Sequence, residues 1–316
     1  MVIPVSIPKI VFMGTSDFAV AILETLWENK FNIVAVFTKA DSLAGRGYVL
    51  QESAVKKFSQ KNKLPLFQPE KLDEKVYQEL KSQQPDLIIV ADYGKIIPSN
   101  ILKMPPYGII NVHPSLLPKF RGSSPIQNVL ISGETETGAT IMLLNEGMDT
   151  GDILAQEKII IQPEETFSEL SLRLAQLSSR LLLRTIPLWL ADKIDPQKQD
   201  EVQASLCQMI KKEDGKIDWT QSALEIFNHF RAFEKWPGTY TFWQDKRINL
   251  KKIALDNLQN FKKLKPGEVF WEEEKLKIQT EKCAIIIEEL QMENKTATDY
   301  KSFVNGYKNF IGSVLK

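Results

Sequence analysis

Three short runs of continuously apolar residues within the first ninety positions constrain the fold more than any other feature of this sequence. The runs are Ile10–Met13, Ile33–Phe37 and Leu87–Val90. A strand with one solvated face alternates apolar and polar residues, so unbroken apolar strands indicate a parallel sheet that is buried on both faces. Between them, Phe18–Trp27 and Ser53–Lys61 have helical periodicity. This order predicts an α/β domain with a doubly wound, Rossmann-like parallel sheet.

Three more strands and a long helix are expected to complete this domain. The helix opens with Thr166 and Glu169, spaced as a capping box in which each side chain satisfies a free backbone donor. Pro187 is expected to kink this helix or to end it. The strands are expected at Gly108–Val112, Ala139–Leu144 and Ile153–Ile161.

The polar stretch 191–204 separates two parts of the chain that differ in pattern. It contains a proline and lacks an apolar period, so we interpret it as a linker. The chain has 316 residues, and two domains are expected because single cores tend to stop growing at about 250–300 residues. The predicted domains are 1–190 and 205–316. Short strand-like runs separated by turn residues indicate that the second domain is a small barrel or sandwich.

Charge and cysteine content exclude several classes of protein. Lys+Arg and Asp+Glu both number 40, so the formal net charge is zero and any nucleic-acid-binding surface must be local. Cys207 and Cys283 are too few for a disulfide framework or a zinc site, which favours a reducing compartment. The N-terminal residues do not resemble a signal peptide, and Leu181–Ala191 is too short to span a bilayer. We therefore expect a cytoplasmic monomer without metal or membrane association.

The ligand crevice of an open parallel sheet lies at the carboxyl ends of its strands. His113 ends one expected strand, and Asn111 lies two residues earlier, so both side chains point to the same side. An amide and an imidazole aimed at one point suit an oxyanion formed in acyl transfer. A buried structural histidine fits the same spacing, and the residues alone leave both interpretations open. The turn Gly14–Phe18 lacks the G-x-G-x-x-G spacing of a dinucleotide site, which argues against NAD binding.

The loop after the strand Ala139–Leu144 carries Asp149 between Gly147 and Gly151. This composition suits a tight turn that presents a carboxylate to the same crevice. An ordinary surface turn has the same composition. Asp149 and Asp152 could bind magnesium, but this stretch does not supply a multi-ligand cage.

Two segments together resemble the signature of the 10-formyltetrahydrofolate-dependent formyltransferases. The first is Asn111–Pro118 (NVHPSLLP), followed by Arg121-Gly122, and the second is Gly147–Asp152 (GMDTGD). The resemblance covers nearly the whole chain, from Lys9 to about Gly312, and implies a Rossmann-like formyltransferase domain joined to a small OB-type β-barrel. It is supported by residues 14–18, 37–47, 215–219 and 231–238.

The resemblance also implies ligands and site residues. The formyl donor would be 10-formyltetrahydrofolate, without a metal, and the acceptor would be the amine of methionine esterified to initiator tRNA. The implied catalytic trio is Asn111, His113 and Asp149. Arg46 is implied to touch the acceptor end of the tRNA. Folate contacts are implied for Ser115, Leu116, Leu117 and Pro118, and we expect the tRNA body to contact Lys251, Lys252, Lys262 and Lys263, although basic runs often only solubilise a surface.

Two positions depart from the family's pattern without touching the trio. Leu43 stands where proline is frequent, and Asp92 stands where a small residue is usual, close to the expected folate pocket.

The same chemistry would serve formyl transfer to a purine precursor or a sugar amine, or hydrolysis of formyl-folate. A non-catalytic RNA-binding protein is an alternative of another class. The C-terminal region argues against transfer to those other amines, and the intact trio argues against the RNA-binding protein.

Overall fold

The computed structural model describes residues 7–44, 49–256 and 264–316, which form two compact units. Unit 1 contains the residues up to Pro125, together with Glu136–Ile160 and Leu170–Gln208. Unit 2 contains Ile126–Thr135, Ile161–Glu169 and Met209–Lys316. The segment 191–204, predicted as a linker, therefore has its contacts within unit 1. In the described part of the chain, no helix is long and apolar enough to cross a membrane.

A seven-stranded sheet in the order β5-β2-β1-β6-β7-β8-β9 forms the centre of unit 1. The strands from β5 to β7 pair in parallel, as the unbroken apolar runs predict. However, β8 is antiparallel to both β7 and β9, so the sheet is mixed at one edge. Exposure alternates along the edge strand β9, as expected for a strand with one solvated face. The bounds are β1 (Lys9–Gly14), β2 (Asn32–Phe37), β5 (Leu66–Phe67), β6 (Leu87–Ala91), β7 (Ile109–His113), β8 (Glu136–Leu143) and β9 (Ile153–Ile160).

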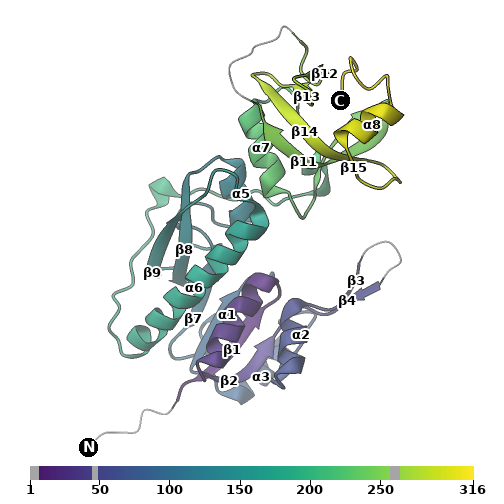
Figure 1. The fold of residues 1–316 in the computed structure, drawn as a ribbon. Helices are drawn as coiled ribbons and strands as arrows, with labels where there is room; N and C mark the ends of the chain where they lie inside the picture. The colour runs from purple at the N-terminus through teal and green to yellow at the C-terminus, as the bar shows by residue number, and fades with distance from the viewer. Residues whose placement is uncertain (1–6, 45–48, 257–263) are drawn as a thin grey trace, which may run out of the picture. The chain divides into compact units, whose positions relative to one another are not determined.

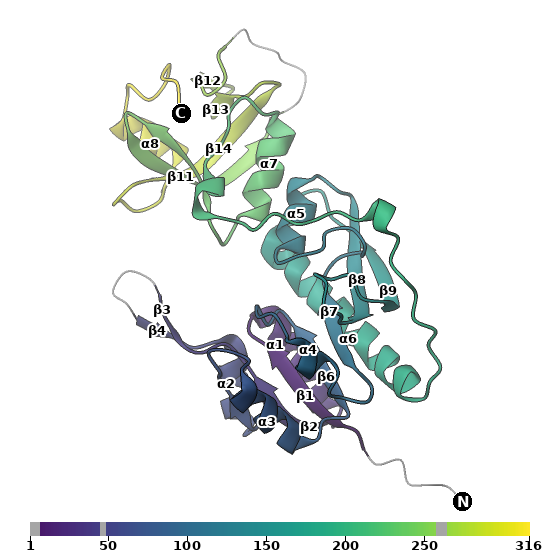
Figure 2. The same ribbon diagram turned by 180° about the vertical axis from the view of Figure 1, so that it is seen from behind.

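Helices cover both faces of this sheet, as Figures 1 and 2 show from opposite sides. On one face, α1 and α6 pack together, and Ser179 donates a hydrogen bond to the carbonyl of Ala21. On the other face, Val76 and Leu80 of α3 join a core cluster with alternate residues of the central strands. The bounds are α1 (Asp17–Glu28), α2 (Ala54–Lys61), α3 (Glu74–Gln83), α4 (Ser99–Leu102) and α6 (Phe167–Leu190), with a hairpin of β3 (Ser42–Ala44) and β4 (Val49–Gln51). A further helix, α5 (Pro125–Ile131), belongs to unit 2 except for its first residue.

The capping box predicted for α6 is confirmed, but the helix continues beyond Pro187. The Thr166 amide donates to Glu169 Oε2 over 2.9 Å, and the Glu169 amide donates to Thr166 Oγ1 over 3.4 Å. Of the two outcomes expected at Pro187, a kink or an end, the structure excludes an end at that residue, because α6 runs to Leu190. Pro187 lies in the last turn, where its missing N–H removes one hydrogen bond while the preceding Ile186 remains fully buried.

Unit 2 is an antiparallel sheet that its C-terminal residues close. Five strands follow the order β10-β11-β14-β13-β12, and β15 pairs with β14. Residues 312–316 then hydrogen-bond to both edges: Lys316 exchanges two backbone bonds with Phe242, and the Val269 amide donates to the carbonyl of Ser313. The bounds are α7 (Ala223–Ala232), β10 (Thr239–Trp243), β11 (Lys246–Leu255), β12 (Val269–Glu272), β13 (Lys275–Gln279), β14 (Ala284–Met292), β15 (Thr298–Asp299) and α8 (Tyr300–Gly306), with a short 3-10 turn at Lys212–Gly215. A second 3-10 turn, Glu201–Gln203, belongs to unit 1.

Phe310 is a fully buried member of the core of unit 2. Its ring is fully buried and packs edge-on against Trp243 at 5.1 Å and against Phe303 at 5.0 Å between centroids. Trp243 therefore faces the core, and its neighbour Phe242 faces outward, as strand alternation requires.

We expect Phe310→Ala to lower the free energy of unfolding by about 3–5 kcal/mol, because it leaves a cavity among these rings. The adjacent Ile311 is partly exposed and provides the control. Ile311→Ala is expected to cost about 1 kcal/mol or less. Equilibrium denaturation of both variants measures the difference, and equal losses would contradict this account of the core.

His229 on α7 gives unit 2 a dependence on pH. Burial lowers the pKa of its imidazole, whose Nε2 donates to the Asp214 carbonyl over 2.6 Å. The unfolded chain then binds a proton at this imidazole more readily than the folded chain does. The free energy of unfolding is therefore highest above about pH 6.5 and falls as the pH drops towards the folded-state pKa. The slope is at most about 1.4 kcal/mol per pH unit. Denaturation curves between pH 5 and 8 should show a smaller slope for His229→Gln, and an unchanged slope would rule out this linkage.

Candidate functional site

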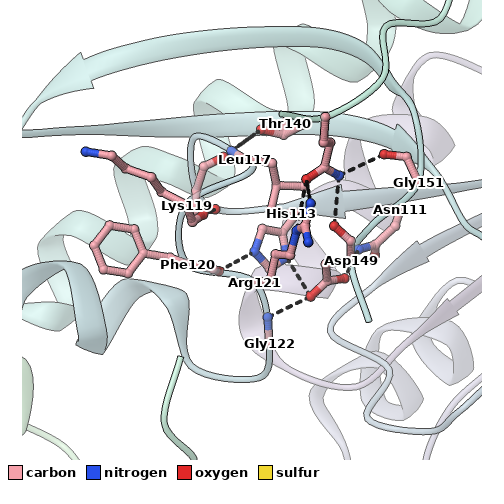
Figure 3. A network of polar contacts seen from close by, with 12 residues as sticks. Asn111, His113, Leu117, Lys119, Phe120, Arg121, Gly122, Thr140, Asp149 and Gly151 are labelled. Atoms are coloured by element: carbon pink, nitrogen blue, oxygen red, sulfur yellow. Dashed lines mark hydrogen bonds and ion pairs between the residues drawn. The ribbon is translucent and has the colours of Figure 1, made fainter. Parts of the chain in front are cut away.

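Asn111 and His113 lie at the carboxyl end of β7, and their side chains face Asp149 (Figure 3). Both are almost completely buried, with exposed fractions of 8 % and 4 %. Asn111 Nδ2 lies 3.4 Å from Asp149 Oδ1, and His113 Nδ1 lies 3.7 Å from Asp149 Oδ2. The structure therefore brings the predicted catalytic trio together. Both contacts are long for hydrogen bonds, so neither the Asn111 amide nor His113 Nδ1 is fully engaged by Asp149.

Asp149 lies in a tight turn between β8 and β9, with its backbone in the left-handed region at φ +52°. Such a conformation costs an L-residue roughly 1–2 kcal/mol, although Asp tolerates it better than most residues. A Cβ on Gly151 would lie 1.7 Å from the carbonyl oxygen of Leu143, so the turn requires glycine there. The Asp149 side chain is 15 % exposed, and its Oδ2 accepts a hydrogen bond of 2.8 Å from the Gly122 amide. The turn thus presents a carboxylate with one oxygen already oriented.

The hydrogen bonds of His113 determine which ring nitrogen carries its proton. Nε2 lies 2.9 Å from the carbonyl oxygen of Phe120 (Figure 3). A carbonyl can only accept, so Nε2 must donate, and in the neutral ring Nδ1 is then the unprotonated nitrogen. Nδ1 faces Asp149, where a proton can be received or donated.

The loop that follows β7 is fixed by two side chains of the antiparallel edge. Buried Thr140 on β8 donates to the carbonyl of Ser115 over 2.7 Å and accepts from the Leu117 amide over 3.2 Å. Gln156 on β9 donates to the carbonyl of Leu117 over 2.9 Å. The predicted folate loop thus has two buried side chains, Ser115 and Leu117, and two half-buried ones, Leu116 and Pro118.

Arg121 and Gln199 approach the trio from outside it, and sequence reasoning assigned a role to neither. Arg121 is 4 % exposed, and hydrogen bonding to Glu201 raises the pKa of its guanidinium. Gln199 lies in the segment predicted as a linker and donates to the carbonyl of Asp149 over 2.8 Å. A glutamine in a polar run carries no periodic signal, so no pattern in the sequence indicated this contact. Among the described residues, no three His, Cys, Asp or Glu side chains gather as metal ligands would.

The residues predicted to contact nucleic acid differ in their surroundings. Lys251 and Lys252 are exposed on β11, and Lys252 Nζ forms an ion pair of 2.7 Å with Glu288. Among the described residues, Lys251 has no ion-pair partner. Arg46, Lys262 and Lys263 lie outside the described residues. Two positions depart from the family's sequence pattern. Of these, Leu43 lies in β3, and Asp92 is exposed at φ +43° directly after β6.

Comparison with known proteins gives consistent matches over both units. Residues 8–186 match the family described as formyl transferase, and residues 209–308 match formyl transferase, C-terminal domain. The methionyl-tRNA formyltransferase of Caldicellulosiruptor saccharolyticus is 41% identical over 97% of this chain and 99% of its own length. That of Carboxydothermus hydrogenoformans is 40% identical over 98% and 99%.

Solved structures share the fold at lower identity. The N-formyltransferase of Helicobacter canadensis, in complex with folinic acid and dTDP-3-aminofucose, superimposes with a TM-score of 0.67 at 22% identity, covering 90% of this chain and 99% of that one. The methionyl-tRNA formyltransferase of Clostridium thermocellum gives 0.55 at 20% identity, covering 79% and 94%.

Proposed function

The chain belongs to the methionyl-tRNA formyltransferase family, and on that premise we propose that it moves the formyl group of 10-formyltetrahydrofolate to the amine of methionine on initiator tRNA, in the cytoplasm. Identity of about 40% over nearly the full length of both chains supports the acceptor. One observation carries the assignment of the site, namely the convergence of Asn111 and His113 on Asp149 at the carboxyl edge of the sheet.

The nucleophile, which is the amine of methionine on the tRNA, needs little activation. A free α-amine has a pKa of about 7.7–8.0, and esterification of the neighbouring carboxyl group lowers it further. A substantial fraction of the amine is therefore neutral near pH 7 and can attack the formyl carbon directly. The residues of the site then have two tasks, which are to stabilise the negative charge that develops on the formyl oxygen and to move the proton that the amine releases.

Asn111 and His113 supply the donors for the formyl oxygen. Only one N–H of the Asn111 amide is directed at Asp149, over a long 3.4 Å, so the other remains for the substrate. His113 is held through Nε2, and its Nδ1 donates when the ring is protonated. The Asp149 carboxylate at 3.7 Å attracts a positive charge on this ring.

Asp149 Oδ1 is the atom placed to move the proton. Oδ2 is already engaged by the Gly122 amide, whereas within the described part of the chain Oδ1 has only the long contact to Asn111. We assign Oδ1 to accept the proton from the attacking amine and to direct it towards the leaving folate nitrogen. The folate would lie along the loop after β7, against the half-buried Leu116 and Pro118, while the buried Ser115 and Leu117 maintain the shape of that loop.

His113→Ala and Asp149→Asn are each expected to lower kcat for formyl transfer to methionyl-tRNA by about 10²–10³, the usual cost of losing one preorganised donor or its charge partner. Asp152→Asn changes a carboxylate of the same loop that has no assigned role, and it should retain near-normal turnover. Thermal unfolding of the three proteins checks that each is folded. Normal kcat in folded His113→Ala would refute the assigned mechanism.

We further propose that unit 2 is an OB-type barrel that binds the tRNA body, while Arg46 contacts the acceptor end. Its closed antiparallel sheet agrees with such a barrel. The exposed lysines of β11 are candidates for phosphate contacts, together with Lys262 and Lys263. Lys251 is the better placed of the two on β11, because Glu288 already neutralises Lys252.

Lys251→Ala is expected to make the dependence of tRNA binding on salt weaker. The magnitude of the slope of the logarithm of the association constant against the logarithm of salt concentration should fall by about one, because a lysine that neutralises a phosphate releases condensed counterions. Lys252→Ala is the matched neighbour, and its slope should change less, since its charge is shared with Glu288. Affinity for methionyl-tRNA measured across a salt series separates the two. Identical slopes in Lys251→Ala and the unmodified protein would remove this lysine from the interface.

A further inference from the structure

The segment 197–207, called the strap below, lies along the candidate site before the chain enters unit 2. Gln197 exchanges two backbone hydrogen bonds with Ile153 at the start of β9. Further along, the Arg121 amide donates to the carbonyl of Ser205 over 2.9 Å, and the Cys207 amide donates to the carbonyl of Arg121 over 2.7 Å. The strap is therefore attached both to the edge of the sheet and to the loop that carries the partners of His113 and Asp149.

Gln199 is the residue of the strap that reaches the turn of Asp149. Its Nε2 donates to the carbonyl oxygens of Asp149 and Gly151, both at 2.8 Å. A primary amide has two N–H bonds, and this one directs both at the same turn. The two acceptors are the carbonyl of the left-handed residue Asp149 and the carbonyl two residues later, so the amide fixes the backbone that leaves the strained residue. Figure 3 shows Asp149 and Gly151 in this network.

The orientation of the Gln199 amide follows from the chemistry of its neighbours. Its Oε1 accepts from Arg121 Nε at 3.0 Å and from Nη2 at 2.9 Å. A guanidinium has only donors and a backbone carbonyl only accepts, so the amide oxygen must face Arg121 and the NH₂ group must face Asp149. Glu201 engages the other side of the guanidinium through two bonds of 2.9 and 2.8 Å. Glu201 therefore holds the Arg121 guanidinium in place, and the guanidinium in turn holds the orientation of the Gln199 amide.

We propose that Gln199, oriented by Arg121, is a positioning residue for the formyl transfer, which acts by holding the Asp149 carboxylate towards Asn111 and His113. The inference rests on the proposed catalytic role of Asp149. Without the amide, the turn loses two hydrogen bonds at its strained point, and the carboxylate samples orientations away from the reacting atoms. Misplacement of a catalytic group by about 1 Å can lower a rate by as much as 10². Substrate binding depends on other residues and is not affected.

Gln199→Ala is expected to lower kcat at least about tenfold while the KM values for 10-formyltetrahydrofolate and for methionyl-tRNA change less than about threefold. Gln203→Ala is the matched control, because Gln203 is an exposed glutamine of the same strap whose side-chain amide, among the residues described, donates only to Asp200. Its kcat should equal that of the unmodified protein. Thermal unfolding of both variants confirms that the chains are folded at the assay temperature.

Gln199→Glu separates positioning from simple attachment of the strap. A glutamate retains the length of the side chain and the acceptor for Arg121, but it presents an oxygen to the two carbonyls of the turn. If Gln199 acts on Asp149, this variant should lose at least as much kcat as Gln199→Ala. If the residue only attaches the strap to Arg121, kcat should be close to normal, and the proposal would be wrong.

A double-mutant cycle with Asp149→Asn tests whether Gln199 acts through Asp149. We expect Gln199→Ala to change the single-turnover rate less than about twofold in the Asp149→Asn background. A full tenfold loss in that background would overturn the inference and leave the role of Asp149 intact. If Asp149→Asn alone has a normal rate, the catalytic assignment of Asp149 is wrong, and the positioning role of Gln199 is wrong with it.

Discussion

A carboxylate that is largely removed from water needs compensating partners, and the surroundings of Asp149 are arranged around that requirement. An unpaired buried charge costs far more than any single hydrogen bond returns. The Gly122 amide supplies one full hydrogen bond, and Asn111 and His113 lie at longer range. The end of strand β7, the loop after it and the turn before β9 must therefore lie close together, so that their polar groups surround this carboxylate. The strap adds the bonds that hold the turn itself.

The site combines rigid supports with uncommitted groups at its centre. Thr140 fixes the loop after β7, and the carbonyl of Phe120 fixes the ring of His113. In contrast, the contacts that Asn111 and His113 make with the Asp149 carboxylate are long for hydrogen bonds. This arrangement is what transition-state stabilisation requires, since preorganised donors contribute most when they are not already satisfied by one another.

Unit 2 shows why a basic cluster in a sequence does not by itself define a binding surface. Lys251 and Lys252 are adjacent on β11 and both exposed, yet Glu288 pairs with only one of them. Similarly, Phe242 and Trp243 are neighbours on β10, but Trp243 packs in the core. Strand alternation predicts that one of two neighbours points inward, and the register against β11 and β14 determines the partners of each exposed side chain.

The sequence by itself determined the local elements of this protein, because unbroken apolar runs, helical periodicity and the capping box of Thr166 and Glu169 act over a few residues. Two short motifs, through their resemblance to a known family, also indicated Asn111, His113 and Asp149 as the candidate trio. Only the tertiary structure decided that β8 runs antiparallel to β7 and that Gln199 reaches the Asp149 turn across 50 residues. Such pairings depend on which groups the folded chain brings together to satisfy their hydrogen bonds, and a contact at that separation leaves no period in the sequence.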